Sequence, residues 1–84
     1  MEVEKDTTYN GWANRDTWCF VLWASSEEAM YASVLEWGKR RRWTARRVQM
    51  WANDWFGARF PDGMRRRYIK WGDVAAAFRE MCDG

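Results

Sequence analysis

The 84-residue chain contains no histidine, which removes the commonest general base and the commonest metal ligand. Without histidine it cannot form a serine–histidine–aspartate triad or a cysteine–histidine pair. It also has no Cys-x-x-Cys motif and no glycine-rich pattern that would cradle a phosphate. We therefore expect a protein that is not an enzyme, with no catalytic residues, no metal site and no cofactor.

Cysteine and long apolar runs are scarce as well. Cys19 and Cys82 are the two cysteines, and a small secreted scaffold normally carries more of them at closer spacings. We expect free thiols, although a single bridge stays open. No apolar run approaches the roughly 20 residues that span a bilayer, and the acidic start does not resemble a signal peptide. These absences predict a cytoplasmic protein with no membrane partner.

Aromatic and charged residues are abundant instead. The chain has eight tryptophans, and hydrophobic residues make up 48% and charged residues 31% of it, as in a globular protein. A chain of this length forms one domain. We expect a flexible N-terminus over residues 1–9 and a single helical domain over residues 10–84.

Hydrophobic periodicity predicts an all-α fold of about four short helices. The first begins at Asn14, the second spans 26–37, the third runs from Thr44 to Gly57, and the fourth spans 74–82 behind Asp73. Asn14 and Thr44 are suitable N-caps, and Ser25 with Glu28 has capping-box spacing. Gly38 is expected to end the second helix. A short extended piece near residues 66–70 stays open.

Large rings are expected to fill the core. The tryptophans assigned to it are Trp18, Trp23, Trp51 and Trp55. Val48, Trp51 and Trp55 fall on one face of the third helix.

Positive charge is concentrated in the middle of the chain. Residues 39–70 carry eleven basic and two acidic residues, and acidic flanks reduce the net charge to +2. Most of these bases are arginines, whose guanidinium binds phosphate or carboxylate through two hydrogen bonds. The block indicates a polyanionic partner, although the same charges could solvate helix faces or pair with the protein's own acids.

The candidate partner-binding residues are the arginine clusters and the tryptophan that separates two of them. They are Arg40, Arg41, Arg42, Trp43, Arg46, Arg47, Arg65, Arg66 and Arg67. Trp43 is the candidate anchor, because an aromatic ring inside an arginine cluster is typical of a base-stacking site or of a cation–π surface. Whether the clusters share one face depends on the fold.

Residues 9–18, YNGWANRDTW, followed by Leu22-Trp23, resemble the opening of a family of small phage and mobile-element proteins. Its signature reads YNGW(T/A)NxxTW and then a short apolar stretch ending LW. Members often carry a later segment that residues 69–75, IKWGDVA, match weakly. The family has no assigned activity, so no functional residue carries over. The resemblance implies a setting in which small proteins commonly disable host defence machinery.

The motif itself is interpreted as a folding element. Gly11 and Trp12 make a tight entry into the first helix, which Asn14 caps. The alternative is a surface pair, Trp12 and Trp18, that grips a ligand.

Two functions fit these features. The first is an inhibitor in the host cytoplasm that binds an acidic surface of a host protein or nucleoprotein complex through its arginines. The second is a nucleic-acid-binding module, with Trp43 or Tyr68 stacking on unpaired bases. A helix-turn-helix is conceivable, but the connection from Gly38 to Thr44 is long for the usual 3–4-residue turn. A structural or accessory role, including self-association, is a third possibility. The chain is expected to be a monomer or a small homo-oligomer.

Overall fold

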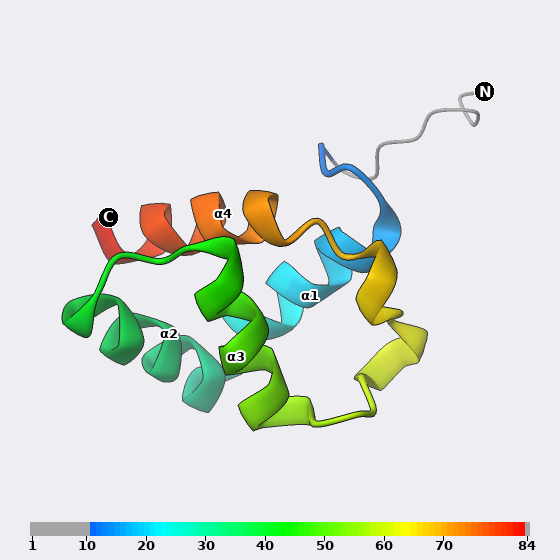
Figure 1. Ribbon diagram of the computed structural model, residues 1–84, viewed down its shortest axis with the longest axis horizontal. Helices are drawn as coiled ribbons and strands as arrows, with labels where there is room; N and C mark the ends of the chain where they lie inside the picture. The colour runs from blue at the N-terminus through cyan, green and yellow to red at the C-terminus, as the bar shows by residue number, and fades with distance from the viewer. Residues whose placement is uncertain (1–10, 84) are drawn as a thin grey trace.

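A computed structural model describes residues 11–83 and shows four α-helices, of which the first three are joined by short connections and the last two by the longer segment 57–70 (Figure 1). The elements are α1 Arg15–Ser26, α2 Glu28–Arg40, α3 Ala45–Phe56, the 3-10 turns η1 Pro61–Gly63 and η2 Arg66–Tyr68, and α4 Trp71–Asp83. α4 packs against the other three α-helices, and α1 also packs against α2. The all-α prediction is confirmed: residues 11–83 contain no strand, and the open segment near 66–70 is a 3-10 turn. The predicted flexible segment, residues 1–9, lies outside the described residues.

None of the four α-helices found in residues 11–83 combines the length and the apolar character that crossing a bilayer requires.

Polar side chains begin two of the helices as predicted. Asn14 Oδ1 accepts a hydrogen bond from Thr17 N at 2.8 Å, and Thr44 Oγ1 accepts one from Arg47 N at 3.2 Å. Each bond satisfies a backbone N–H that has no partner within the helix. Gly57 ends α3 with a φ of 63°, in the left-handed region that glycine favours.

Two other predicted helix starts are wrong. Ser25 and Glu28 form no capping box, because α1 continues past Ser25 and uses its hydroxyl as a donor to a carbonyl one turn earlier. The N-cap of α2 is Glu27, which makes no side-chain capping bond. Asp73 lies in the first turn of α4, which begins at Trp71, and its negative charge still suits that end of the helix.

Gly38 does not end α2 but lies inside it, at a point of close helix contact. A Cβ atom at this position would come within 2.3 Å of Cys82 Sγ and 3.3 Å of Trp43 Nε1. The absence of a side chain therefore allows α4 and the indole of Trp43 to approach the backbone of α2. This glycine serves packing, and a sequence pattern cannot distinguish that use from a stop signal.

We predict that Gly38→Ala destabilises the protein by about 1–3 kcal/mol, because the new methyl group overlaps Cys82 Sγ. Chemical denaturation followed by circular dichroism measures the change. Cys82→Ala in the same chain should restore most of the loss. The matched control is Gly72→Ala in α4, where no neighbouring atom lies within 4 Å and stability should rise by up to about 1 kcal/mol. A Gly38→Ala protein as stable as the wild type would contradict this packing argument.

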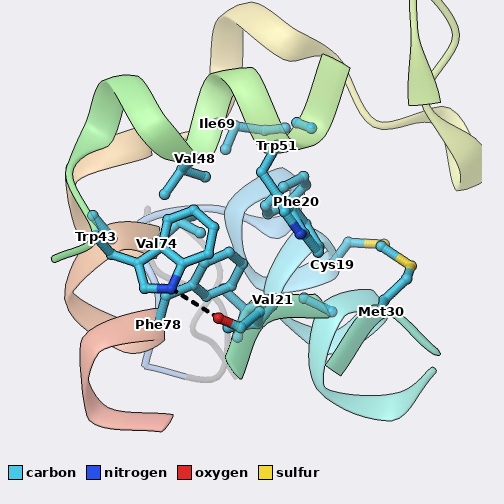
Figure 2. Close-up of a cluster of buried hydrophobic side chains, with 14 of the residues drawn as sticks. Cys19, Phe20, Val21, Met30, Trp43, Val48, Trp51, Ile69, Val74 and Phe78 are labelled. Carbon is cyan, nitrogen blue, oxygen red and sulfur yellow. Dashed lines mark hydrogen bonds between the residues drawn. The ribbon is translucent and has the colours of Figure 1, made fainter. Parts of the chain in front are cut away.

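Aromatic rings fill the centre of the core (Figure 2). Phe20 is fully buried, and the ring centroids of Trp71, Trp51 and Phe78 lie 5.4, 5.9 and 6.2 Å from its own. Two of these contacts are edge-to-face, the arrangement that the charge distribution of aromatic rings prefers. The predicted tryptophan-rich core is confirmed.

The four tryptophans assigned to this core differ in depth. Trp51 is fully buried, whereas Trp18 and Trp23 are half-buried against the core. Trp55 is 40% exposed, so its assignment to the interior is wrong. Helical spacing places Trp55 on the correct face of α3, but this face reaches the edge of the core one turn after Trp51. There the Trp55 indole leans on the Trp51 ring, with 6.1 Å between centroids.

The first turn of α1 holds the irregular segment 61–70 in place. Three of its side chains bond to the backbone of that segment: Asn14 Nδ2 donates to Tyr68 O (2.7 Å), Asp16 Oδ2 accepts from Arg65 N (2.9 Å), and Thr17 Oγ1 accepts from Lys70 N (2.9 Å). Asp16 and Thr17 are buried, so these bonds satisfy polar groups that water does not reach. Residues 14–17 of the motif therefore have a structural role, consistent with a folding element.

We predict that Thr17→Val, which keeps the side-chain shape, costs about 1–3 kcal/mol because it leaves the Lys70 N–H without its acceptor. Hydrogen exchange should show faster exchange of the Lys70 amide. Thr17→Ser keeps the hydroxyl and should retain protection of this amide. Equal exchange in both variants would mean that the hydroxyl does not hold the segment.

Candidate functional site

Seven of the predicted binding residues form two groups of exposed arginines, one at the connection between α2 and α3 and one at η2, two segments that Figure 1 shows. We call Arg40, Arg41, Arg42 and Arg46 the connector cluster, because they flank or form the connection between α2 and α3. We call Arg65, Arg66 and Arg67 the η2 cluster. The two remaining predicted residues, Trp43 and Arg47, are not part of the open surface.

Trp43 is a core residue, so the prediction that it anchors a partner is wrong. It is 1% exposed, and its Nε1 donates to Val34 O at 3.1 Å (Figure 2). Its ring stacks on Trp37 with 5.7 Å between centroids and meets the Phe78 ring at 4.9 Å. The chain turns this residue inward between exposed arginines, among them Arg42 and Arg46. A residue surrounded by charges in sequence can therefore lie in the interior.

Arg47 has a structural task at the end of α2. Its Nη1 donates to Trp37 O at 3.1 Å and also to Arg41 O. Its guanidinium lies over the rings of Trp37 and Trp43, at 5.3 and 5.1 Å from the centroids. Burial lowers the pKa of the Arg47 guanidinium, and the charges of Arg41 and Arg40 add to this effect. Arg47 therefore satisfies terminal carbonyls and covers the Trp37–Trp43 stack.

The connector cluster carries positive charge that the described part of the chain does not neutralise. Within residues 11–83, Arg41, Arg42 and Arg46 form no ion pair, and Arg40 has only a 4.0 Å contact with Glu36 one turn away. The cluster surrounds a surface hollow of about 660 Å³. Met50 also lines this hollow and is 53% exposed. Unneutralised guanidiniums thus lie beside an exposed apolar side chain.

The η2 cluster differs because each of its arginines interacts with the protein itself. The Arg65 Nε lies 3.5 Å from Asp16 Oδ2, and the guanidiniums of Arg65 and Arg67 lie 4.4 and 5.4 Å from the Tyr68 centroid. The Arg66 Nη1 donates to Asn53 Oδ1, and its guanidinium lies 5.7 Å from the Trp71 centroid. These contacts fix the positions of the charges and cover the exposed ring of Tyr68.

The outer side of α3 links the two clusters. Arg46, Met50 and Asn53 are exposed at a spacing of four and three residues, which places them on one side of the helix. Asn53 in turn accepts the hydrogen bond from Arg66. The clusters are therefore neighbours across this side of α3. The candidate binding residues named from the sequence do not include Met50 and Asn53, although the helical period places both opposite Val48 and Trp51.

The cysteines offer little chemistry. Cys19 and Cys82 are both free, as expected, and Cys19 is buried. Burial raises the pKa of the Cys19 thiol, which keeps it in the unreactive protonated form. No group of three or more cysteine, aspartate or glutamate side chains within residues 11–83 is placed to hold a metal ion. The features that stand out are cationic and apolar surfaces, which suit binding.

Comparison of the chain with protein-family models, with curated proteins and with solved structures found no match.

We predict that Trp43→Ala destabilises the protein by about 3–5 kcal/mol, because it removes a fully enclosed indole and leaves a cavity. Trp55→Ala should cost only about 1–2 kcal/mol, because the Trp55 ring is 40% exposed. Thermal and chemical unfolding of the two variants test this difference. If Trp43→Ala were as stable as Trp55→Ala, the interior position of Trp43 would be wrong.

Proposed function

We propose that this chain is a non-enzymatic binding protein whose connector cluster docks on an acidic surface of a partner protein. The observation that carries the proposal is the set of unneutralised guanidiniums of Arg41, Arg42 and Arg46 around a hollow that Met50 also lines. The sequence resemblance to phage and mobile-element proteins is the basis for proposing that the partner belongs to a host cell. The partner would be a host protein complex, inhibited in the host cytoplasm.

The composition of this surface favours a protein partner. Arginine and methionine are both enriched at protein–protein interfaces relative to the rest of the surface. Arginine can bind a carboxylate through two parallel hydrogen bonds, while the adjacent Met50 side chain supplies apolar area that excludes water. An acidic surface with a small apolar centre would complement both features.

Nucleic-acid binding is the second candidate, and one observation favours it. Because α2 extends to Arg40, the connection to α3 is the four-residue segment 41–44, which matches a helix-turn-helix turn. The long connection that weighed against this motif is therefore absent. Base stacking loses support, since Trp43 is buried and two guanidiniums already lie over the Tyr68 ring. A nucleic-acid partner would thus be a duplex that contacts α3.

We predict that Arg42→Glu combined with Arg46→Glu abolishes partner binding and leaves the fold intact, because both side chains are exposed and unpaired within residues 11–83. The control combines Ala32→Glu with Ala76→Glu, two exposed helix sites outside both arginine clusters that also add two carboxylates. Affinity capture from host lysate with quantitative mass spectrometry compares the proteins, and circular dichroism checks folding.

A host protein that the wild type and the control capture, and the connector variant does not, is the expected result. The same proteins are titrated with a labelled mixed-sequence DNA duplex at about 50 and 200 mM salt. Submicromolar duplex binding that falls by orders of magnitude between these salts would replace the protein partner with DNA. Capture that persists in the connector variant would show that the connector cluster is not the docking surface.

A further inference from the structure

A second hollow, of about 560 Å³, lies beside the η2 cluster. Phe60, Met64 and Trp71 contribute apolar surface to it, and Arg65, Arg66 and Arg67 contribute the charge. We propose that this hollow binds an acidic peptide segment of the partner protein that inserts an aromatic side chain between the arginines. The inference rests on the proposed function in that the partner is a protein, but it concerns a different surface.

The apolar part of the hollow is rigidly supported. The rings of Phe60 and Trp71 lie 6.4 Å apart, edge to face, and each packs against Phe20, at 6.3 and 5.4 Å. Phe20 is fully buried at the centre of the core. Both rings remain half-buried where they line the hollow, and Met64 is buried beneath it. An apolar side chain of the ligand that removes this surface from water stabilises the complex.

The charged rim is positioned before any ligand arrives. Arg65 is held by Asp16, and Arg66 is held by Asn53 and lies over Trp71. Arg67 makes no hydrogen bond or ion pair within residues 11–83, so its five N–H donors are available. Fixed guanidiniums lose less conformational entropy when a carboxylate binds. Among these three arginines only Arg65 has a carboxylate partner within residues 11–83, which leaves an excess of positive charge that an acidic segment complements.

The same contacts favour a peptide over a nucleic-acid base. A base stacks on a free ring face. The Tyr68 ring has the guanidiniums of Arg65 and Arg67 over it, and the Trp71 ring has the Arg66 guanidinium over it and Phe20 against it. An aromatic side chain can instead insert with its edge toward these rings, and neighbouring carboxylates can reach Arg66 and Arg67.

Short labelled peptides test this proposal without the natural partner. Fluorescence anisotropy at low salt compares the fluorescein-labelled peptide EEFEE with EEAEE and with labelled pentathymidylate. The phenylalanine peptide should bind about tenfold more tightly than the alanine peptide, because part of the ring leaves water. Equal affinities of the two peptides, or tighter binding of pentathymidylate, would overturn the proposal.

A variant locates the binding. Ala58 is exposed and lines the hollow, so Ala58→Glu places a carboxylate in it with no loss of buried contacts. We expect binding of EEFEE to weaken at least about tenfold, because the new carboxylate repels the acidic peptide and its side chain obstructs the hollow. The control Ala32→Glu, on the exposed side of α2, should bind like the wild type. Unchanged affinity in Ala58→Glu would overturn the site.

Two further measurements complete the test. In a ¹⁵N–¹H spectrum, EEFEE should shift the indole signal of Trp71, and an unshifted signal would contradict the proposal. The variant Arg42→Glu with Arg46→Glu should still bind EEFEE; if it does not, the peptide occupies the connector cluster and this hollow is not its site. If Arg42→Glu with Arg46→Glu still captures the partner, the proposed role of the connector cluster is refuted. The proposal for this hollow is judged separately, by the binding of EEFEE.

Discussion

Hydrogen bonds that Asp16 and Thr17 accept from the backbone N–H groups of Arg65 and Lys70 hold together the part of the fold that helix formation does not organise. The segment between α3 and α4 has only two short 3-10 turns, so most of its backbone groups need partners elsewhere. The first turn of α1 supplies several of them from buried side chains. Because the same segment carries the η2 cluster and Phe60, the shape of that surface depends on residues distant in the sequence.

Arginines in this protein fall into two physical groups that composition does not separate. Arg47 and Arg79 bond to backbone carbonyls around Trp37 and Trp43, and so belong to the folding of the molecule. Arg42 and Arg46 have no such partner within residues 11–83 and keep all their donors for another molecule. The first group adds nothing to the capacity for binding a partner. A count of basic residues therefore overstates the surface that is free to bind.

Local chemistry made much of the fold predictable. The caps at Asn14 and Thr44 and the buried stripe of α3 follow from side-chain hydrogen bonding and helical period, which short segments display. The errors at Gly38 and Trp43 arose where the outcome depends on α4. Gly38 is required by the approach of Cys82, and Trp43 turns inward to meet Phe78. Neither contact can be read from the residues that neighbour Gly38 and Trp43 in the sequence. The exposure of most of the arginines was therefore predictable, whereas the interior position of Trp43 among them was not.

The placement of the charges also decides how the molecule behaves in an electric field. With a net charge of only +2 the protein is nearly neutral, yet eleven of its fourteen basic residues lie in residues 39–70, together with two acids. The positive charge is therefore concentrated in one part of the chain rather than spread evenly over it. Such a molecule turns as it approaches a negative surface, so that its arginine-bearing side arrives first. It would be retained on a cation exchanger well beyond what its net charge implies, and its encounters with a partner would be biased in orientation before any contact forms.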